Sequence, residues 1–92
     1  MKVIWTRPAL RELEAIADFI ARQNPRAAER VTDRVLAHAA TLGEQSYVGR
    51  PGRIAGTREL VVTGTPFIVP YRVRVQILSV FHGARRWPSD FP

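Results

Sequence analysis

The sequence predicts an α+β domain in which a two-helix hairpin packs on an antiparallel sheet of about four strands, one of them supplied by the N-terminus. Two observations carry this prediction. Up to Gly43, apolar residues recur at the three- and four-residue spacing of amphipathic helices. Beyond residue 57, β-branched and aromatic runs are separated by turn-forming residues, which is typical of strands. Because 92 residues suffice for one small domain, we expect a single domain over residues 1–92.

The first predicted elements are a short strand, "KVIW" at residues 2–5, and a helix from Pro8 to about Arg22. Thr6 is a suitable N-cap, Pro8 fits the first turn, and "QNP" at residues 23–25 ends the helix. One face of this helix is apolar, and it consists of Leu10, Leu13, Ile16, Ala17 and Ile20.

A second helix follows almost at once, with Asn24 as its N-cap and Pro25 in its first turn. Its apolar stripe consists of Ala28, Val31, Val35, Ala39 and Leu42. Because the link between the two helices is so short, they must lie against each other as a hairpin.

Three runs in the second half of the chain have strand character: residues 58–63, 67–73 and 75–81. "TGTP" between the first two runs is a turn signature. Pro70 lacks an N–H group, so we do not expect full pairing on both sides at this position. Residues 43–57 hold four of the six glycines and show no periodicity, so they are predicted to form a basic loop.

Composition excludes several classes of protein. The chain has no cysteine, so it has neither a disulfide framework nor a thiolate zinc site, as is usual in a reducing cytoplasm. It has no apolar run long enough to span a membrane, and its N-terminus lacks the apolar core of a signal peptide. We therefore expect a cytoplasmic protein that needs no metal, no cofactor and no membrane.

Charge is the most informative bulk property. The net charge is +6, and all of the basic residues except Lys2 are arginines, whose planar guanidinium groups bind carboxylates and phosphates through paired hydrogen bonds. The acidic residues gather in the first half of the chain, whereas the second half has only Glu59 and Asp90. The C-terminal half is therefore expected to face an anion, either a nucleic-acid backbone or the acidic surface of a protein.

The order of these elements, together with "GRPGR", "GTREL", "YRV" and "ILSVFHGARRWP", resembles the RelE/ParE family of small bacterial toxins from type II toxin–antitoxin modules. The resemblance covers almost the whole chain. It implies a RelE/ParE-like fold and a toxin that is neutralised by a cognate antitoxin in a hetero-oligomer. Antitoxin tails in this family are commonly acidic and helical, and such a tail suits a basic toxin.

The resemblance leaves two activities to choose between. RelE-like members cleave messenger RNA on the ribosome without a metal, whereas ParE-like members inhibit DNA gyrase. The central strand of the ribonucleases usually reads Tyr-Arg-Leu-Val-Tyr, and its arginine contacts the phosphate. The corresponding "FIVPY" places Ile68 at that position, and an aliphatic side chain cannot stabilise a phosphate. We therefore favour an inhibitor of DNA gyrase that arrests growth, as plasmid stabilisation toxins of the ParE type do.

Three residues keep the alternative of an mRNA endoribonuclease open. His82 lies near the place where some family nucleases carry a C-terminal His or Tyr, and Arg85 and Arg86 could supply cations. His82 would then act as base or acid. The simpler interpretation of His82 is a half-buried polar residue at a strand end. A further alternative is a nucleic-acid-binding domain outside any toxin system.

Basic side chains of the second half, with one tryptophan, are the expected binding surface for the target or the antitoxin. These residues are Arg50, Arg53, Arg58, Arg72, Arg74, Arg85, Arg86 and Trp87.

Three other residues of this half are expected to be structural. Tyr47 and Tyr71 are predicted to belong to the core, and Glu59 is predicted to pair with Arg58 or Arg72. Relatives usually have Gly or Asp between the last two strands, but "YRVRVQIL" has no turn former. Either the turn at residues 72–74 is very tight or the strands are short.

Overall fold

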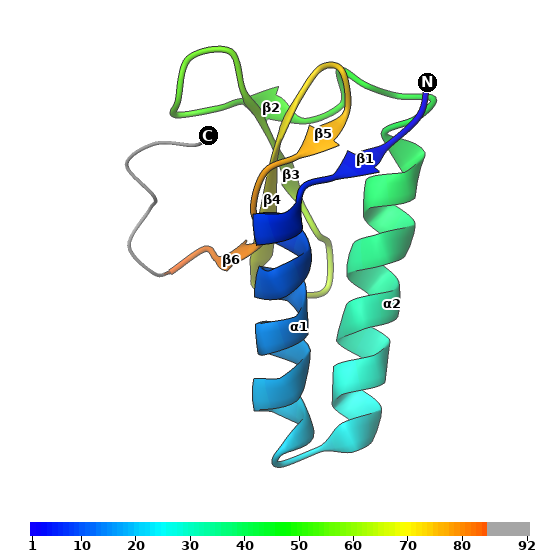
Figure 1. Cartoon of the computed structure of the whole chain (residues 1–92), viewed down its shortest axis with the longest axis vertical. Helices are drawn as coiled ribbons and strands as arrows, with labels where there is room; N and C mark the ends of the chain where they lie inside the picture. Colours follow the sequence, from blue (N-terminus) through cyan, green and yellow to red (C-terminus); the bar gives the residue numbers. More distant parts are fainter. Residues whose placement is uncertain (85–92) are drawn as a thin grey trace.

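The computed structural model describes residues 1–84, which form a helix hairpin against a twisted sheet (Figure 1). The elements in chain order are β1 (Ile4–Trp5), α1 (Arg7–Ala21), α2 (Pro25–Thr41), β2 (Arg50–Pro51), β3 (Arg58–Val61), β4 (Phe67–Arg72), β5 (Gln76–Ile77) and β6 (Phe81–His82). The predicted α+β class is thereby confirmed.

Both helices begin at the predicted caps. The Thr6 side-chain oxygen accepts a hydrogen bond from the Ala9 N–H group at 3.3 Å, and the Asn24 side-chain oxygen accepts one from the Ala27 N–H group at 3.1 Å. The apolar stripe of α2 is placed as predicted. In α1, the prediction that Leu10 faces the core is wrong, because Leu10 is 44% exposed and the fully buried Ala9 takes that place.

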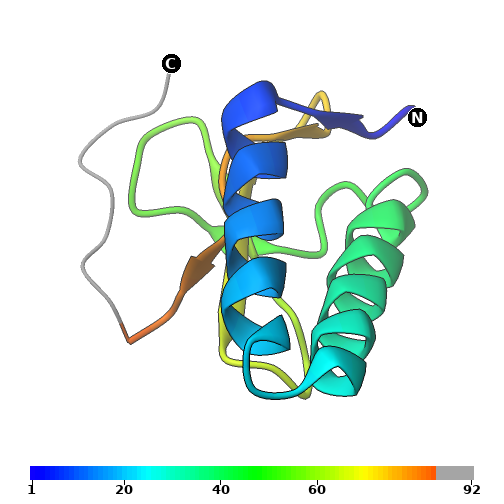
Figure 2. The ribbon, with the colours of Figure 1, turned by 60° about the horizontal axis from the view of Figure 1, so that its bottom comes forward.

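The strand order is β1-β5-β4-β3-β2, and β6 also pairs with β4. β3 runs antiparallel along β4, from the pair Arg58 and Tyr71 to the pair Val61 and Ile68. β1 joins the edge of β5 in parallel, so the sheet is mixed rather than wholly antiparallel as predicted. The parallel pairing is possible because the helix hairpin carries the chain from β1 across to the rest of the sheet (Figure 2).

A second correction concerns residues 43–57, which were predicted to form a loop throughout. β2 lies within them and pairs antiparallel with the start of β3, through Arg50 opposite Glu59 and Pro51 opposite Arg58. The propensity pattern did not reveal β2 because a two-residue strand containing a proline is too short to show a period. β2 fixes the basic loop to the sheet.

The predicted strand at residues 75–81 is divided opposite Pro70. Tyr71 lies opposite Ile77 and Ile68 opposite Phe81, so two residues of β4 face the three residues 78–80. The Pro70 carbonyl accepts the Leu78 N–H group at 3.1 Å, which shows that the missing N–H of Pro70 points to the same side. A one-residue bulge therefore occurs where the ladder lacks a donor.

The turn between β4 and β5 is very tight. Arg72 pairs directly with Gln76, which leaves three residues to reverse the chain. The last of them, Val75, has φ 47°, in the left-handed region where Gly, Asn or Asp normally stands. Val75 is nevertheless fully buried, so its apolar contacts oppose the backbone strain.

The core lies between the helices and the sheet. Its fully buried side chains include Val35, Leu42, Val62, Val69, Tyr71 and Ile77. Neither α1 nor α2, the helices of residues 1–84, has the length and apolar character needed to cross a bilayer.

Candidate functional site

Five of the predicted binding residues gather at one end of the sheet. The loop that contains β2 and the turn between β4 and β5 both lie at this end (Figure 1). We call these residues the basic end, and they are Arg50, Arg53, Arg58, Arg72 and Arg74.

Glu59 organises the loop of the basic end. Its carboxylate is 3% exposed, and it accepts hydrogen bonds from Arg50 Nε at 2.9 Å and from the Arg53 backbone N–H group at 3.0 Å. The prediction that Glu59 pairs with Arg58 or Arg72 is therefore wrong. Arg50 stands directly opposite Glu59 in the β2–β3 ladder, whereas the neighbouring Arg58 points to the other face of the sheet.

Arg58 supports the loop rather than facing solvent. Its Nη1 donates to the Gly49 carbonyl at 2.6 Å and to the Tyr47 carbonyl at 3.3 Å, and its guanidinium lies 5.0 Å from the centre of the Tyr47 ring. The prediction that Tyr47 belongs to the core is wrong, because this side chain is 67% exposed. The exposed Tyr47 ring therefore packs over the guanidinium of Arg58.

Tyr71 is a core residue, as predicted, and its hydroxyl binds the backbone of the loop before β2 from the buried side. The hydroxyl donates to the Ser46 carbonyl at 2.8 Å and accepts the Gly49 N–H group at 3.0 Å. A Cβ atom at Gly49 would lie 2.6 Å from this hydroxyl, so only glycine fits there. The loop is thus held in one conformation by contacts from two adjacent strands.

Arg72 and Arg74 are the arginines of the basic end best placed to bind a partner. Arg72 is the last residue of β4 before the tight turn and is partly exposed, and Arg74 is the exposed middle residue of the turn. Within residues 1–84, neither guanidinium pairs with a carboxylate. Both charges are therefore at the surface without a carboxylate partner from this part of the chain.

His82 lies at the opposite end of β4. It stands opposite Phe67, whose ring it meets edge-on with centroids 5.8 Å apart. Its Nδ1 is 3.1 Å from the Ala84 backbone nitrogen. An N–H group can only donate, so Nδ1 accepts and the neutral ring carries its proton on Nε2. The lone pair that a general base needs is occupied by this hydrogen bond.

The structure does not bring His82 together with the arginines of the neighbouring strand. Arg72 and Phe67 are five residues apart on β4, which corresponds to about 17 Å along a strand. The other predicted catalytic or binding residues, Arg85, Arg86 and Trp87, lie outside the described residues. No three histidine, aspartate or glutamate side chains of residues 1–84 are grouped so that they could hold a metal ion.

Ile68 occupies the centre of the sheet and is 8% exposed. It pairs with Val61 on one side and with Phe81 on the other, and a Cβ atom at Gly83 would lie 2.9 Å from its Cδ1. The position is therefore filled by a tightly packed aliphatic side chain, which cannot contact a phosphate.

The sequence prediction missed a second basic site, which lies on α2. Arg30, Arg34 and His38 are spaced four residues apart and therefore share one helix face. The four-residue spacing of these side chains is the signal in the sequence that could have revealed them.

Comparisons with known proteins agree with one another. The sequence profile of the family described as "ParE toxin of type II toxin-antitoxin system, parDE" matches residues 3–87. The protein Y4kP of Sinorhizobium fredii is 44% identical over 90 residues, which is 96% of this chain and 94% of that protein. Toxin RelE2 of Caulobacter vibrioides is 39% identical over 87 residues, which is 91% of this chain and 97% of that one.

A solved structure has the same fold. The chain titled "Chromosomal ParDE TA system from P. aeruginosa" superimposes with a TM-score of 0.81 at 30% sequence identity, and the match covers 89% of this chain and 95% of that one.

Proposed function

This chain belongs to the ParE toxin family of type II toxin–antitoxin systems, and from that premise we propose that it arrests growth by inhibiting DNA gyrase. The alternative of a nucleic-acid-binding domain outside any toxin system does not agree with this membership. The choice between gyrase and messenger RNA depends on the residues that each activity would require.

The observation that carries the proposal is the packing of Ile68. RNA cleavage by attack of a 2′-hydroxyl needs cations around the scissile phosphate and a base with a free lone pair. At the centre of the sheet this chain has a buried aliphatic side chain. Nδ1 of His82, at the end of that sheet, accepts a hydrogen bond from the backbone. Both features favour a toxin that acts by binding.

We assign binding to the basic end, with Arg72 and Arg74 as its accessible cations and Arg50, Arg53 and Arg58 as its frame. Arg85, Arg86 and Trp87 extend the same proposal into the C-terminal residues. The antitoxin of the pair is proposed to be acidic and helical and to cover this surface in a hetero-oligomer.

Cleavage of messenger RNA on the ribosome is the second candidate. It is favoured by the similarity to a relative named RelE2 and by the position of His82 on β6, close to the end of the described chain. In this case His82 would be the catalytic residue, with Arg85 and Arg86 as its cations.

Expression of the chain alone in bacterial cells distinguishes the two candidates. Growth, transcript integrity and the DNA damage response are followed together for the parent, for His82→Ala, for Arg72→Gln/Arg74→Gln and for the control Arg7→Gln/Arg11→Gln, which changes the charge equally on exposed residues of α1. We expect intact transcripts in every case. The DNA damage response should be weakened by Arg72→Gln/Arg74→Gln and unchanged by His82→Ala and by the control. Transcript cleavage that disappears in His82→Ala would instead establish the nuclease.

A further inference from the structure

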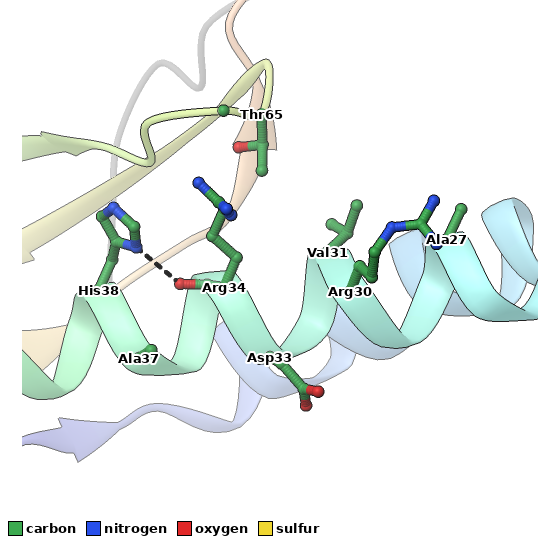
Figure 3. Close-up of a pocket in the computed structure, with 9 residues that line it drawn as sticks. Ala27, Arg30, Val31, Asp33, Arg34, Ala37, His38 and Thr65 are labelled. Carbon is green, nitrogen blue, oxygen red and sulfur yellow. Dashed lines mark hydrogen bonds between the residues drawn. The ribbon is translucent and has the colours of Figure 1, made fainter.

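A groove of about 780 Å³ runs between α2 and the loop that joins β3 to β4 (Figure 3). Its lining includes neither His82 nor a residue of the basic end, and the proposed function does not use it. Its walls include Arg30, Val31, Arg34, His38, Gly64 and Thr65. Figure 3 shows that Arg34 and His38 project from the helix toward the loop that carries Thr65.

Arg34 is held in place before any ligand binds. Its Nη1 donates to the Thr63 carbonyl at 2.9 Å, which fixes the guanidinium against the loop. A Cβ atom at residue 64 would lie 2.6 Å from this Nη1, and Gly64 has φ +84°. Glycine is therefore favoured by the left-handed turn, and its lack of a side chain leaves room for the guanidinium of Arg34. Four further N–H groups of the guanidinium remain for an anion.

His38 and Arg30 continue the same line of donors. Nδ1 of His38 is 2.9 Å from the Arg34 carbonyl, which can only accept, so Nδ1 carries the proton and Nε2 is directed away from the helix backbone. The three side chains are four residues apart, hence about 6 Å apart along the helix axis. They form a basic row about 12 Å long, in which Arg30 and Arg34 are the permanent cations.

No carboxylate of residues 1–84 forms an ion pair with this row. Asp33 also borders the groove, but Figure 3 shows that its carboxylate points away from Arg34 and Thr65. An anion that enters the groove would therefore meet little repulsion.

We propose that this groove binds the phosphodiester backbone of a nucleic acid. A nucleic-acid strand is a regular row of anions, and it matches the evenly spaced basic side chains of Arg30, Arg34 and His38. An acidic helical peptide would also need large apolar contacts to bind in a groove. The apolar part of this groove consists of Ala27, Val31 and Ala37, whereas the large side chains Phe19 and Phe67 line a different groove. The proposal goes beyond the proposed function and holds for either target.

The test is binding of the purified full chain to a fluorescent DNA duplex of about 20 base pairs, at salt concentrations from about 50 to about 200 mM. The groove variant is Arg30→Gln/Arg34→Gln. The control, Arg11→Gln/Arg22→Gln, removes the same charge from exposed positions of α1 and its C-cap. Arg30→Gln alone is measured as well, since this side chain has no hydrogen bond within residues 1–84 whose loss could affect folding.

We expect the groove variant to weaken binding about tenfold at the lowest salt and to reduce the slope of log affinity against log salt by about 2. Arg30→Gln should cause about half of this change in slope, and the control should change affinity less than about threefold. An RNA duplex of the same length shows which nucleic acid binds better.

Two results would overturn the proposal. Equal losses in the groove variant and in the control would show that only diffuse charge attracts DNA. Absence of binding to both nucleic acids, together with groove-dependent binding of polyglutamate, would assign the groove to an acidic protein. Because none of these measurements involves gyrase or the ribosome, they stand whether or not the proposed function is right.

Discussion

At the scale of single residues, two glutamates accept hydrogen bonds from backbone N–H groups that have no strand partner. Glu59 accepts the Arg53 N–H group in the loop of the basic end, and Glu12 of α1 accepts the Val80 N–H group at 3.2 Å and the Ser79 hydroxyl at 3.1 Å in the bulge. Neither role is visible in the sequence, because a carboxylate in a helix or strand gives no sign of which distant backbone group it meets. Each carboxylate therefore ties irregular backbone to a helix or strand.

Replacing Glu59 by Gln should destabilise the chain by about 2 kcal/mol. The amide keeps one acceptor oxygen but loses the charge that strengthens the bonds from Arg50 and from the Arg53 backbone. Urea unfolding measures the effect, with the exposed Glu14→Gln as control, which should stay within about 0.5 kcal/mol of the parent. Equal stability of the two variants would mean that Glu59 does not hold the loop.

At the scale of elements, the bulge opposite Pro70 shows how one residue changes a strand. The missing donor interrupts the ladder, the chain at residues 78–80 bulges, and α1 supplies the acceptor that the bulge needs. The sequence correctly indicated imperfect pairing at Pro70, but it could not indicate that Glu12, far away in the chain, completes the hydrogen bonding.

Glu12→Ala should therefore destabilise the chain by about 2 kcal/mol, since it leaves the buried N–H group of Val80 without its acceptor. Glu14→Ala is the matched control two residues later on the exposed part of α1, and we expect less than about 0.5 kcal/mol for it. The free energy of unfolding is read from urea titration. Hydrogen exchange of the Val80 amide should accelerate in the first variant, and unchanged protection there would contradict this account.

The tight turn after β4 gives a second prediction at this scale. Val62 and Val75 are both fully buried, but only Val75 has a left-handed backbone, which is costly for a β-branched residue. Val62→Ala should lower the free energy of unfolding by about 2 kcal/mol. Val75→Ala should lower it by about 1 kcal/mol less than Val62→Ala does, because it also relieves backbone strain. Thermal unfolding of the two variants measures the difference. Equal losses would show that Val75 carries no strain.

At the scale of the whole molecule, the fold class was predictable, and the arrangement of the cations was not. The helices follow from apolar spacing and from Thr6 and Asn24, which act locally. The basic end depends on long-range contacts such as that of Tyr71 with Gly49, and Arg58 proved to support the loop. Charge composition gives the number of cations, and only packing decides which of them a partner can reach.

Arg72→Gln/Arg74→Gln should raise the concentration of the chain needed for half-inhibition of gyrase by about tenfold, because the proposed binding surface loses two charges that no carboxylate of residues 1–84 pairs with. Supercoiling assays with purified gyrase give this concentration. The control Arg7→Gln/Arg11→Gln has the same net charge and should behave like the parent. An equal rise of this concentration in the control would show that the basic end is not part of the surface that binds gyrase.

The most direct test of the central claim is a supercoiling assay of purified DNA gyrase with the parent chain and with His82→Ala, run beside a translation reaction in which messenger RNA is examined for cleavage. We predict that both proteins inhibit supercoiling equally and leave the messenger RNA intact. Cleavage of the messenger RNA by the parent chain but not by His82→Ala, with gyrase unimpaired by either protein, would contradict the assignment and make the end of β4 where His82 lies a nuclease site.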